Sequence, residues 1–416
     1  MKIAVIGAGV SGLVAAHRLA PDHEVTVYEA GDYAGGHTNT IDIEVDGQRL
    51  PVDTGFIVYN QSTYPNFCRL LDELGVDTGE TSMSFGVSDP ASGFEYGTVG
   101  LGGWIARRRN LVDPRLYRLI PEIFRFFRRA GAALDLAADS LAGRTLRDFL
   151  DEGGFSETFR RFYIVPMTAA VWSAPPSTAL EFPALTLLRF LRNHGLLSAN
   201  GAPTWRYVRG GSRTYVQRLL QRFGGRLHLS SPVARVRRDA DGVELELLAG
   251  GSRRYDRVVI ATHSDQALAM LADPSDAERE VLGAIDYQAN EAVLHTDASL
   301  LPKHRGAWAS WNYRLHADPD RPATLSYHMN RLQSLPVETP VCVTLNDDGQ
   351  VEPQRVLRRI EYAHPVYTQA TVAAQQRWDE ISGPGRLVAY CGAYWFYGFH
   401  EDGVRSGLRA AEAVTA

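Results

Sequence analysis

The 416-residue chain contains very little cysteine and lysine and has no long hydrophobic run. Its three cysteines, Cys68, Cys342 and Cys391, form no Cys-x-x-Cys pair, which argues against a disulfide framework and a zinc site, and we assign no metal ligands. Lys2 and Lys303 are the only lysines, which leaves few candidates for lysine chemistry. No stretch approaches the roughly 18 apolar residues of a membrane-spanning helix, and the first residues lack the pattern of a secretion signal. We therefore expect a cytoplasmic protein.

The charge balance shows no excess of positive charge. The chain has 43 Lys and Arg against 48 Asp and Glu, a formal net charge of −5, which argues against a nucleic-acid-binding protein with a global basic field. Hydrophobic residues make up 45% and charged residues 22% of the chain, as in ordinary folded proteins. At this length the sequence predicts about two to three domains, or two intertwined ones.

The chain begins with a glycine motif between a strand and a helix. Residues 3–6 predict a buried parallel strand, and the pattern G-x-G-x-x-G of Gly7, Gly9 and Gly12 opens a helical pattern at residues 13–19. Gly7 permits a tight turn, Gly9 lets the backbone approach a pyrophosphate, and Gly12 lets the helix pack close to the strand. The motif predicts phosphates at the helix N-terminus.

An acidic residue follows the second predicted strand. Residues 24–28 form that strand, and Glu29 lies 20 residues after Gly9, where a carboxylate accepts the hydrogen bonds of an adenosine ribose and disfavours a 2′-phosphate. A glycine-rich turn without a ligand is the alternative interpretation. Strand, glycines, helix, strand and acid in register favour a dinucleotide, without distinguishing NAD from FAD.

The loop after Glu29 carries two adjacent glycines, Gly35 and Gly36, followed by His37 and Thr38. Here the sequence resembles the long FAD-binding signature of the flavin amine oxidase superfamily, which includes protoporphyrinogen oxidases and phytoene desaturases. The resemblance implies FAD, with the glycine loop passing over the diphosphate. Many relatives have an Arg after the two glycines, whereas this chain has His37, so a guanidinium–phosphate contact is not carried over.

The resemblance also implies that later segments return to the FAD-binding domain. Residues 207–212 resemble the superfamily's re-entry element, residues 255–262 predict a further buried strand, and residues 390–407 resemble the carboxyl-terminal flavin element. In that element a helix N-terminus faces the flavin pyrimidine ring, where helix amides stabilise negative charge on the reduced flavin. The residues that the resemblance assigns to FAD binding are Gly7, Gly9, Val10, Ser11, Gly12, Glu29, Ala30, Gly35, Gly36, His37, Thr38, Val233, Thr262, Gly392, Asp402, Gly403 and Val404.

We therefore expect an α/β fold, with a Rossmann-like FAD-binding domain of the glutathione reductase type and an interleaved substrate domain. Short alternating segments in residues 291–362 predict an antiparallel sheet as the floor of that domain. The expected FAD-binding domain comprises residues 1–65, 205–285 and 386–416. The substrate domain comprises residues 66–204 and 286–385, with a helical insertion at 104–200.

The helical insertion has an unusual local charge. Residues 101–130 contain eight arginines against Asp113 and Glu122, interleaved with large apolar side chains. One interpretation is a membrane-surface element, at the inner face of the membrane, that meets anionic lipid heads. The other is an ordinary amphipathic helix with a solvated basic face. The arginines that we assign to membrane contact are Arg107, Arg108, Arg109, Arg125 and Arg128.

Several longer runs carry a narrower resemblance. Residues 309–313, 327–333, 343–346, 362–367 and 398–403 together look like the bacterial FAD-dependent oxidoreductases encoded beside cyclopropane-fatty-acid synthase-type lipid methyltransferases. This resemblance implies chemistry on membrane-lipid acyl chains, such as desaturation or saturation next to a modified carbon, and a functional link to a lipid methyltransferase. Of these, we expect a desaturase or dehydrogenase.

Candidates for handling a proton are His364, His400, His328 and Tyr394, which lie in segments expected near the cofactor. Two alternative functions stay open. A small-molecule amine oxidase commonly uses a lysine near the flavin, and Lys303, in a predicted turn, is the only candidate beyond Lys2. A non-redox FAD-dependent double-bond isomerase fits the same sequence.

Overall fold

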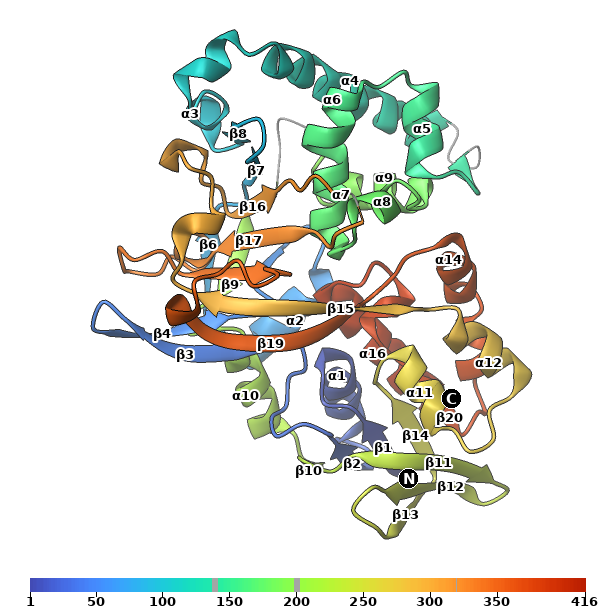
Figure 1. Cartoon of the computed structure of the whole chain (residues 1–416). Helices are drawn as coiled ribbons and strands as arrows, with labels where there is room; N and C mark the ends of the chain where they lie inside the picture. Colours follow the sequence, from blue (N-terminus) through green and yellow to red (C-terminus); the bar gives the residue numbers. More distant parts are fainter. Residues whose placement is uncertain (137–140, 198–202, 319) are drawn as a thin grey trace.

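The structure, a computed structural model, describes residues 1–136, 141–197, 203–318 and 320–416. A parallel sheet lies at one end of the molecule, a larger sheet lies in the middle, and a group of helices covers the opposite end (Figure 1). The predicted insertion at 104–200 falls in that helical end, and its residues 137–140 and 198–200 lie outside the described ones. The domain boundaries drawn from the sequence stay a prediction.

The parallel sheet has five strands in the order β10-β2-β1-β14-β20. Its strands are β1 (Lys2–Ile6), β2 (Glu24–Tyr28), β10 (Arg226–His228), β14 (Arg257–Ile260) and β20 (Val388–Tyr390). β1 and β2 are buried from their second residue onward, as expected for strands covered on both faces. The helices α1 (Val10–Leu19) and α16 (His400–Thr415) pack against each other beside this sheet (Figure 1). The glycine motif and the chain terminus thus meet in space.

A three-stranded antiparallel sheet adjoins the parallel one. Its strands are β11 (Val233–Asp239), β12 (Gly242–Leu247) and β13 (Ser252–Tyr255). The predicted strand at 255–262 is too long, because Tyr255 pairs with Val243 in β13 and the chain changes sheets at Asp256. The Asp256 carboxylate accepts a hydrogen bond from the backbone N–H of Lys2, which fixes this break beside β1.

The middle sheet has seven strands in the order β19-β15-β18-β17-β16-β7-β8. Its strands are β7 (Phe85–Asp89), β8 (Phe94–Gly97), β15 (Tyr287–His295), β16 (Trp311–Arg314), β17 (Thr324–His328), β18 (Cys342–Leu345) and β19 (Val356–Pro365). The sequence predicts an antiparallel sheet, and all pairs are antiparallel except β16 with β7. A parallel pair needs a long connection, and the helical insertion and further elements supply it between these two strands.

Two smaller sheets connect these layers. One is the hairpin β3 (Thr40–Val45) and β4 (Gln48–Asp53), and the other combines β5 (Val58–Asn60), β6 (Thr78–Thr81) and β9 (Trp205–Val208). The fully buried Asp53 carboxylate accepts hydrogen bonds from Ser212 N at 2.8 Å and Gln333 Nε2 at 3.0 Å. Burial raises the pKa of Asp53 to about 6. The Asp53 carboxyl group therefore links the re-entry segment at Ser212 to Gln333, the residue that follows α13 (Met329–Leu332).

The helical end contains one long amphipathic helix among short ones. Its helices are α3 (Gly100–Trp104), η1 (Arg108–Val112), α4 (Pro114–Leu136), α5 (Leu146–Glu152), α6 (Glu157–Phe159), η3 (Arg160–Ile164), α7 (Val165–Trp172), α8 (Pro176–Ala179) and α9 (Ala184–Asn193). Leu119 and Phe126 of α4 are fully buried in the hydrophobic core, whereas Tyr117 and Phe124 are 63% and 54% exposed. On each face the two named residues are seven positions apart, about two helical turns, as in an amphipathic helix.

The remaining helices cover the sheets and connect them. They are α2 (Pro65–Leu74), α10 (Arg213–Arg222), α11 (Ser264–Met270), α12 (Asp276–Gly283), α13 (Met329–Leu332), α14 (Gln369–Gln375) and α15 (Trp378–Ser382), with short 3₁₀ turns η4 (Ala298–Leu300), η5 (Arg305–Ala307), η6 (Pro353–Arg355) and η7 (Ala393–Trp395). Within the described ranges, no helix combines the length and the apolar character needed to cross a membrane.

Candidate active site

The glycine turn after β1 leaves an open approach to the N-terminus of α1. Gly7 has φ +101°, and a Cβ built on it would lie 2.9 Å from the carbonyl oxygen of Ala261, so only glycine fits there. A Cβ on Gly12 would lie 2.0 Å from the Gly7 carbonyl oxygen. Around a Cβ on Gly9, in contrast, no atom of the described residues beyond its chain neighbours lies within 4 Å. Of these three glycines, Gly9 alone faces free space.

The first turn of α1 has free backbone donors. Gly9 is the N-cap residue, and no side chain caps the helix there. The amides of the first turn, which include Val10 and Ser11, have no partners inside a helix, and the helix dipole adds partial positive charge at this end. A helix end of this kind accepts an anion such as a pyrophosphate.

The loop with the two glycines closes over this helix end. Gly35 N donates to the Ala8 carbonyl oxygen at 2.8 Å, and Gly35 pairs with Gly9 in an isolated bridge. A Cβ on Gly36 would lie 3.2 Å from Cα of Gly9, and Gly36 has φ +59°. The next residue, His37, has a buried Nε2 with no hydrogen-bond partner among the described residues. A buried polar atom without a partner fits a ligand beside this loop.

The Glu29 carboxylate lies at the carboxyl end of β2, beside the glycine turn. Its Oε2 accepts from Ala8 N at 2.7 Å and its Oε1 accepts from Gly31 N at 2.8 Å. Each carboxylate oxygen can accept a further hydrogen bond, so the oriented group suits ribose hydroxyls. Thr262 follows β14 at the same edge, and its methyl group would lie 3.4 Å from a Cβ on Gly7. Val233 is buried at the start of β11, and Ala30 is exposed after Glu29.

The carboxyl-terminal element brings a second helix N-terminus to this region. Asp402 Oδ2 accepts hydrogen bonds from Phe399 N at 2.9 Å and Tyr397 N at 3.2 Å, and so orders the segment before α16. Burial raises the pKa of Asp402 to about 7. Gly403 packs against Val10 of α1, and Gly392 against the ring of Tyr394, while Val404 is buried. The residues of both helix ends fit the expected FAD.

A cluster of imidazole and phenol rings lies next to the glycine loop. His37 stacks on Tyr362 at 4.7 Å between ring centroids and lies 5.4 Å from His364 and 6.3 Å from His263. His263 in turn stacks on Tyr287 at 4.3 Å. His263 follows Thr262 directly after the carboxyl end of β14. This position, next to a residue assigned to FAD binding, is the one feature of the sequence that could have pointed to His263. The sequence interpretation missed His263 and Tyr362, because the cluster joins four separate chain segments.

His364 is partly buried and His400 is buried, both are neutral, and they have different partners. His364 Nδ1 lies 2.7 Å from Asn290 Oδ1, and burial lowers the pKa of His364 to about 4. His400 Nε2 lies 2.6 Å from the hydroxyl of Tyr215, and its ring stacks on Phe56 at 3.7 Å. Burial lowers the pKa of His400 to about 3. His400 thus supports the hydroxyls of Tyr215 and Thr38, which are 2.6 Å apart.

The structure does not bring His328 into the histidine cluster. It lies at the end of β17, where its ring meets Trp308 edge-on at 5.4 Å. Tyr394 borders the cluster through Tyr287, with ring centroids 6.4 Å apart, and its buried hydroxyl has no partner in the described chain. Lys303 is exposed, and its backbone N–H donates to Glu95. Of the four proton-handling candidates, His364 lies in the histidine cluster and Tyr394 at its border, whereas His400 and His328 lie elsewhere. Their roles stay predictions.

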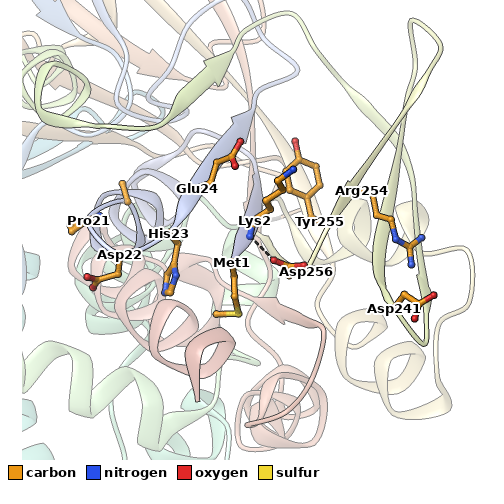
Figure 2. Close-up of a pocket in the computed structure, with 11 residues that line it drawn as sticks. Met1, Lys2, Pro21, Asp22, His23, Glu24, Asp241, Arg254, Tyr255 and Asp256 are labelled. Carbon is orange, nitrogen blue, oxygen red and sulfur yellow. Dashed lines mark hydrogen bonds between the residues drawn. The ribbon is translucent and has the colours of Figure 1, made fainter.

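A solvent-open hollow of about 760 Å³ lies at the other end of the parallel sheet (Figure 2). Lys2 and Glu24, which line it, are the first residues of β1 and β2, whereas the glycine turn follows the end of β1. Ligands of such sheets bind at the carboxyl ends of the strands, so this hollow is not the dinucleotide site. Within the described ranges, no group of His, Cys, Asp or Glu has a metal-binding arrangement.

Comparisons with known proteins agree with the geometry of the site. The sequence matches the family described as flavin containing amine oxidoreductase over residues 10–415. It is 29% identical to the flavin-containing amine oxidase A of Canis lupus familiaris over 255 residues, which are 59% of this chain and 46% of that protein. The chain therefore spans about half the length of the curated relatives it matches.

Solved structures resemble this fold along nearly the whole chain. The cyclohexylamine oxidase of Brevibacterium oxydans has a TM-score of 0.68 at 18% identity, covering 99% of this chain and 98% of that one. A fatty acid isomerase of P. acnes that produces CLA has a TM-score of 0.67 at 15% identity, covering 99% and 97%. At these identities the likeness establishes the fold alone.

Proposed function

The chain belongs to the flavin containing amine oxidoreductase family, and we propose that its substrate is an acyl chain of a membrane lipid. The protein is an FAD-dependent oxidoreductase. In the proposed reaction it acts as a desaturase or dehydrogenase on a phospholipid fatty acid, methylated or unsaturated. When bound, FAD supplies hydride transfer at N5. The narrower sequence resemblance supports this substrate, and with it a functional link to a lipid methyltransferase.

One observation carries the proposal: an aromatic wall lies between the helical insertion and the segment before α16. We use this name for Trp172, Phe190, Tyr367, Tyr397 and Phe399. Phe190 stacks on Phe399 at 4.8 Å, and Trp172 lies 6.2 Å from Tyr367. The indole N–H of Trp172 donates to the Tyr397 carbonyl oxygen at 3.1 Å. Trp172, Phe190 and Tyr367 are buried in the core of the helical end, and Tyr397 and Phe399 pack against it, so the apolar packing continues up to the flavin element, where aromatic rings suit the wall of an acyl-chain site.

In this proposal, separate groups of residues bind FAD, hold the substrate and accept a proton. The first turn of α1 and the loop at Gly35 and Gly36 bind the diphosphate, and Glu29 orients the adenosine ribose. The N-terminus of α16 offers partial positive charge to the flavin end. The aromatic wall excludes water and holds the acyl chain, and the histidine cluster offers neutral imidazoles as proton acceptors. These assignments are the proposal's, and each residue can be tested separately.

We also propose that the helical end contacts an anionic membrane surface. Six of the eleven large apolar side chains that are exposed in the described chain lie between residues 101 and 124. We call these the exposed apolar patch: Leu101, Ile105, Leu111, Val112, Tyr117 and Phe124. Four exposed arginines lie in the same part of the sequence, namely Arg108, Arg109, Arg118 and Arg128. Exposed apolar side chains together with exposed cations in one segment suit insertion into an anionic lipid interface.

Two of the arginines that the sequence suggested for membrane contact, Arg107 and Arg125, are partly buried and contact other residues of the chain. Arg125 pairs with Glu122 at 2.9 Å and lies over the ring of Phe155 at 4.4 Å. Arg107 is half-buried beside Gly93. The inner face of α4 belongs to the core, so the amphipathic-helix interpretation accounts for that face, and the membrane proposal rests on the outer face alone.

The first test is an anaerobic visible spectrum of the purified flavoprotein. Spectra are recorded before and after addition of phospholipids from a bacterium that contains the methyltransferase, with simple amines as the comparison. We expect bleaching of the flavin by the lipids and none by the amines. Bleaching by an amine alone would reject the lipid substrate. Absence of bleaching by either would reject a dehydrogenase and favour a reductase or an isomerase.

The family match itself favours a second candidate, an oxidase of small amines. The flavin-containing amine oxidase A and the cyclohexylamine oxidase carry that activity in their names. Against it, Lys303 and Lys2 are both exposed, so neither supplies a buried lysine beside the cluster. The third alternative, a double-bond isomerase, corresponds to the name of the P. acnes neighbour. It leaves oxidised flavin after turnover, which the same spectra detect.

A further inference from the structure

The side chain of Asn290 has its orientation fixed by its partners. Its Nδ2 lies 3.3 Å from the carbonyl oxygen of Ser173, and the neighbouring Gln288 Nε2 lies 2.5 Å from the same oxygen. A carbonyl oxygen only accepts hydrogen bonds, so the atom of Asn290 that faces it must be the amide nitrogen. A second contact of Nδ2, with Asn346 Oδ1 at 3.4 Å, agrees. Asn290 is 1% exposed, so water does not compete for these positions.

This orientation determines which nitrogen of His364 carries the hydrogen. The oxygen of Asn290 then faces Nδ1 of His364 at 2.7 Å. An amide oxygen cannot donate, so Nδ1 must carry the proton in that hydrogen bond. Burial, together with nearby His263, lowers the pKa of His364 to about 4, so the ring is neutral at pH 7. A neutral imidazole with its hydrogen on Nδ1 has a free lone pair on Nε2.

Strand register explains why these side chains meet. In the antiparallel pair of β15 and β19, Gln288 lies opposite His364 and Asn290 lies opposite Tyr362. Side chains two apart on a strand share a face, so all four lie on one face, with Asn290 diagonal to His364. The same face meets the glycine loop, because Tyr362 and His364 both contact His37.

We infer that Asn290 is a positioning residue that holds His364 with its hydrogen on Nδ1, so that Nε2 accepts a proton from the substrate. The chemical identity of this step rests on the proposed function. In a dehydrogenation that forms a C=C bond, two neighbouring C–H bonds break. One hydrogen leaves as a hydride, which FAD takes, and the other leaves as a proton, which Nε2 takes. His364 then carries one positive charge until the proton is released.

The surroundings of His364 leave Nε2 as the acceptor. The titratable groups that face it are His37 from the glycine loop, His263 from the start of α11, and Tyr362 from its own strand. Burial lowers the pKa of His37 and of His263 and raises that of Tyr362, so all three are neutral near pH 7. No carboxylate is among these groups, so nothing compensates an imidazolium there in the resting protein.

The tautomer can be measured without any substrate. The flavoprotein is labelled with ¹⁵N-histidine, and the ring signals of His364 are assigned by their loss in His364→Gln. We expect a protonated-type shift for Nδ1 and an unprotonated-type shift for Nε2 from pH 6 to pH 8. In Asn290→Ala the two shifts should move toward a tautomer mixture. A wild-type spectrum with the hydrogen on Nε2, or unchanged shifts in Asn290→Ala, would overturn the inference.

A matched control separates positioning from general disturbance. Gln288→Ala removes the other hydrogen bond to Ser173 but touches neither nitrogen of His364, so it should leave the His364 shifts unchanged. If Gln288→Ala moves them as much as Asn290→Ala does, Asn290 has no special role and the inference fails.

The catalytic half is tested by the pH profile of anaerobic flavin reduction. Asn290→Asp places a carboxylate against Nδ1 and raises the pKa of His364, so the acid limb of the profile should move up by at least one pH unit. His364→Gln should slow reduction by about 100-fold or more. An unmoved limb would overturn the proton-acceptor role. If lipids never bleach the flavin while the wild-type shifts are as expected, the proposed substrate is wrong and the positioning role of Asn290 stands.

Discussion

Gly403 of helix α16 lies directly against Val10 of helix α1, so closely that a Cβ built on Gly403 would come within 2.6 Å of Cγ1 of Val10. One turn later, a Cβ on Gly407 would lie 2.3 Å from the carbonyl oxygen of Ser11. These two contacts bring the N-terminus of the last helix beside the N-terminus of the first. The diphosphate end and the flavin end of the expected cofactor site therefore depend on one helix crossing.

Gly407→Ala should weaken this crossing. Its Cβ would meet backbone, which cannot move aside as a flexible side chain does, so we expect a loss of about 1–3 kcal/mol in the free energy of unfolding. FAD retention should fall as well, because the two helix ends separate. Gly131→Ala in α4 is the matched control, since a Cβ there meets nothing within 4 Å and alanine favours a helix. Denaturant unfolding and the flavin-to-protein absorbance ratio measure both effects, and equal behaviour of the two variants would contradict the prediction.

Gly9→Val should separate cofactor binding from stability. Gly9 has φ −72° and ψ 178°, which valine adopts without strain, and no protein atom lies near its added Cβ. We therefore expect the apoprotein to unfold within about 0.5 kcal/mol of wild type, while FAD is lost from the purified protein. Gly7→Ala should instead destabilise the fold, because Gly7 has φ +101°. A Gly9→Val protein that purifies fully yellow would show that the diphosphate lies elsewhere.

Asp402 should make stability fall as pH rises. Burial raises the pKa of this carboxyl from its ordinary value of 3.8 to about 7. Between these pH values the folded protein holds a proton that the unfolded chain has released, so the free energy of unfolding decreases through this window and stays lower above it. Asp402→Asn keeps an oxygen acceptor for Phe399 N and removes the charge. The variant should therefore gain in Tm relative to wild type between pH 4 and pH 8. A Tm difference that does not change with pH would contradict the raised pKa.

The exposed apolar patch should govern binding to vesicles. We expect wild type to sediment with vesicles that contain phosphatidylglycerol and to bind less at high salt, because salt screens exposed charges. The double variant Tyr117→Ser and Phe124→Ser should weaken vesicle binding. A second variant that combines Arg108→Glu, Arg109→Glu, Arg118→Glu and Arg128→Glu should weaken it by about 100-fold or more, at about 1 kcal/mol per cation.

The control for vesicle binding is Leu248→Ser. Leu248 is an exposed apolar side chain, 71% exposed, next to β12 in the sheet beside the parallel one. It should bind vesicles as wild type does. Flavin content should stay unchanged in all of these variants, because none of the positions lies near the glycine turn. A wild-type protein that does not sediment with any vesicle rejects the membrane contact.

Sequence reasoning located the parts of the site that depend on neighbouring residues. The strand at 24–28 matches β2, and the glycines at 7, 9 and 12 form the turn that the spacing implies, because chain geometry over a few residues fixes both. The strand predicted at 255–262 is longer than β14. Tyr255 is buried at the end of β13, and from the sequence alone a buried residue at this position looks like the first residue of one continuous strand. Sequence reasoning also placed His328 in a segment expected near the cofactor; the structure puts that ring against Trp308, and its role stays a prediction.

The sequence by itself determined the FAD-binding family, the strand–glycine–helix unit and the basic character of the insertion, because each depends on residues that are consecutive or regularly spaced in the chain. Only the tertiary structure decided which face of α4 is buried, that Arg125 pairs with Glu122, and that His37, His263 and His364 meet. The contact of Asn290 with His364 spans 74 residues and follows from strand register in the middle sheet. Such contacts depend on long-range pairing, which no local pattern of residues specifies.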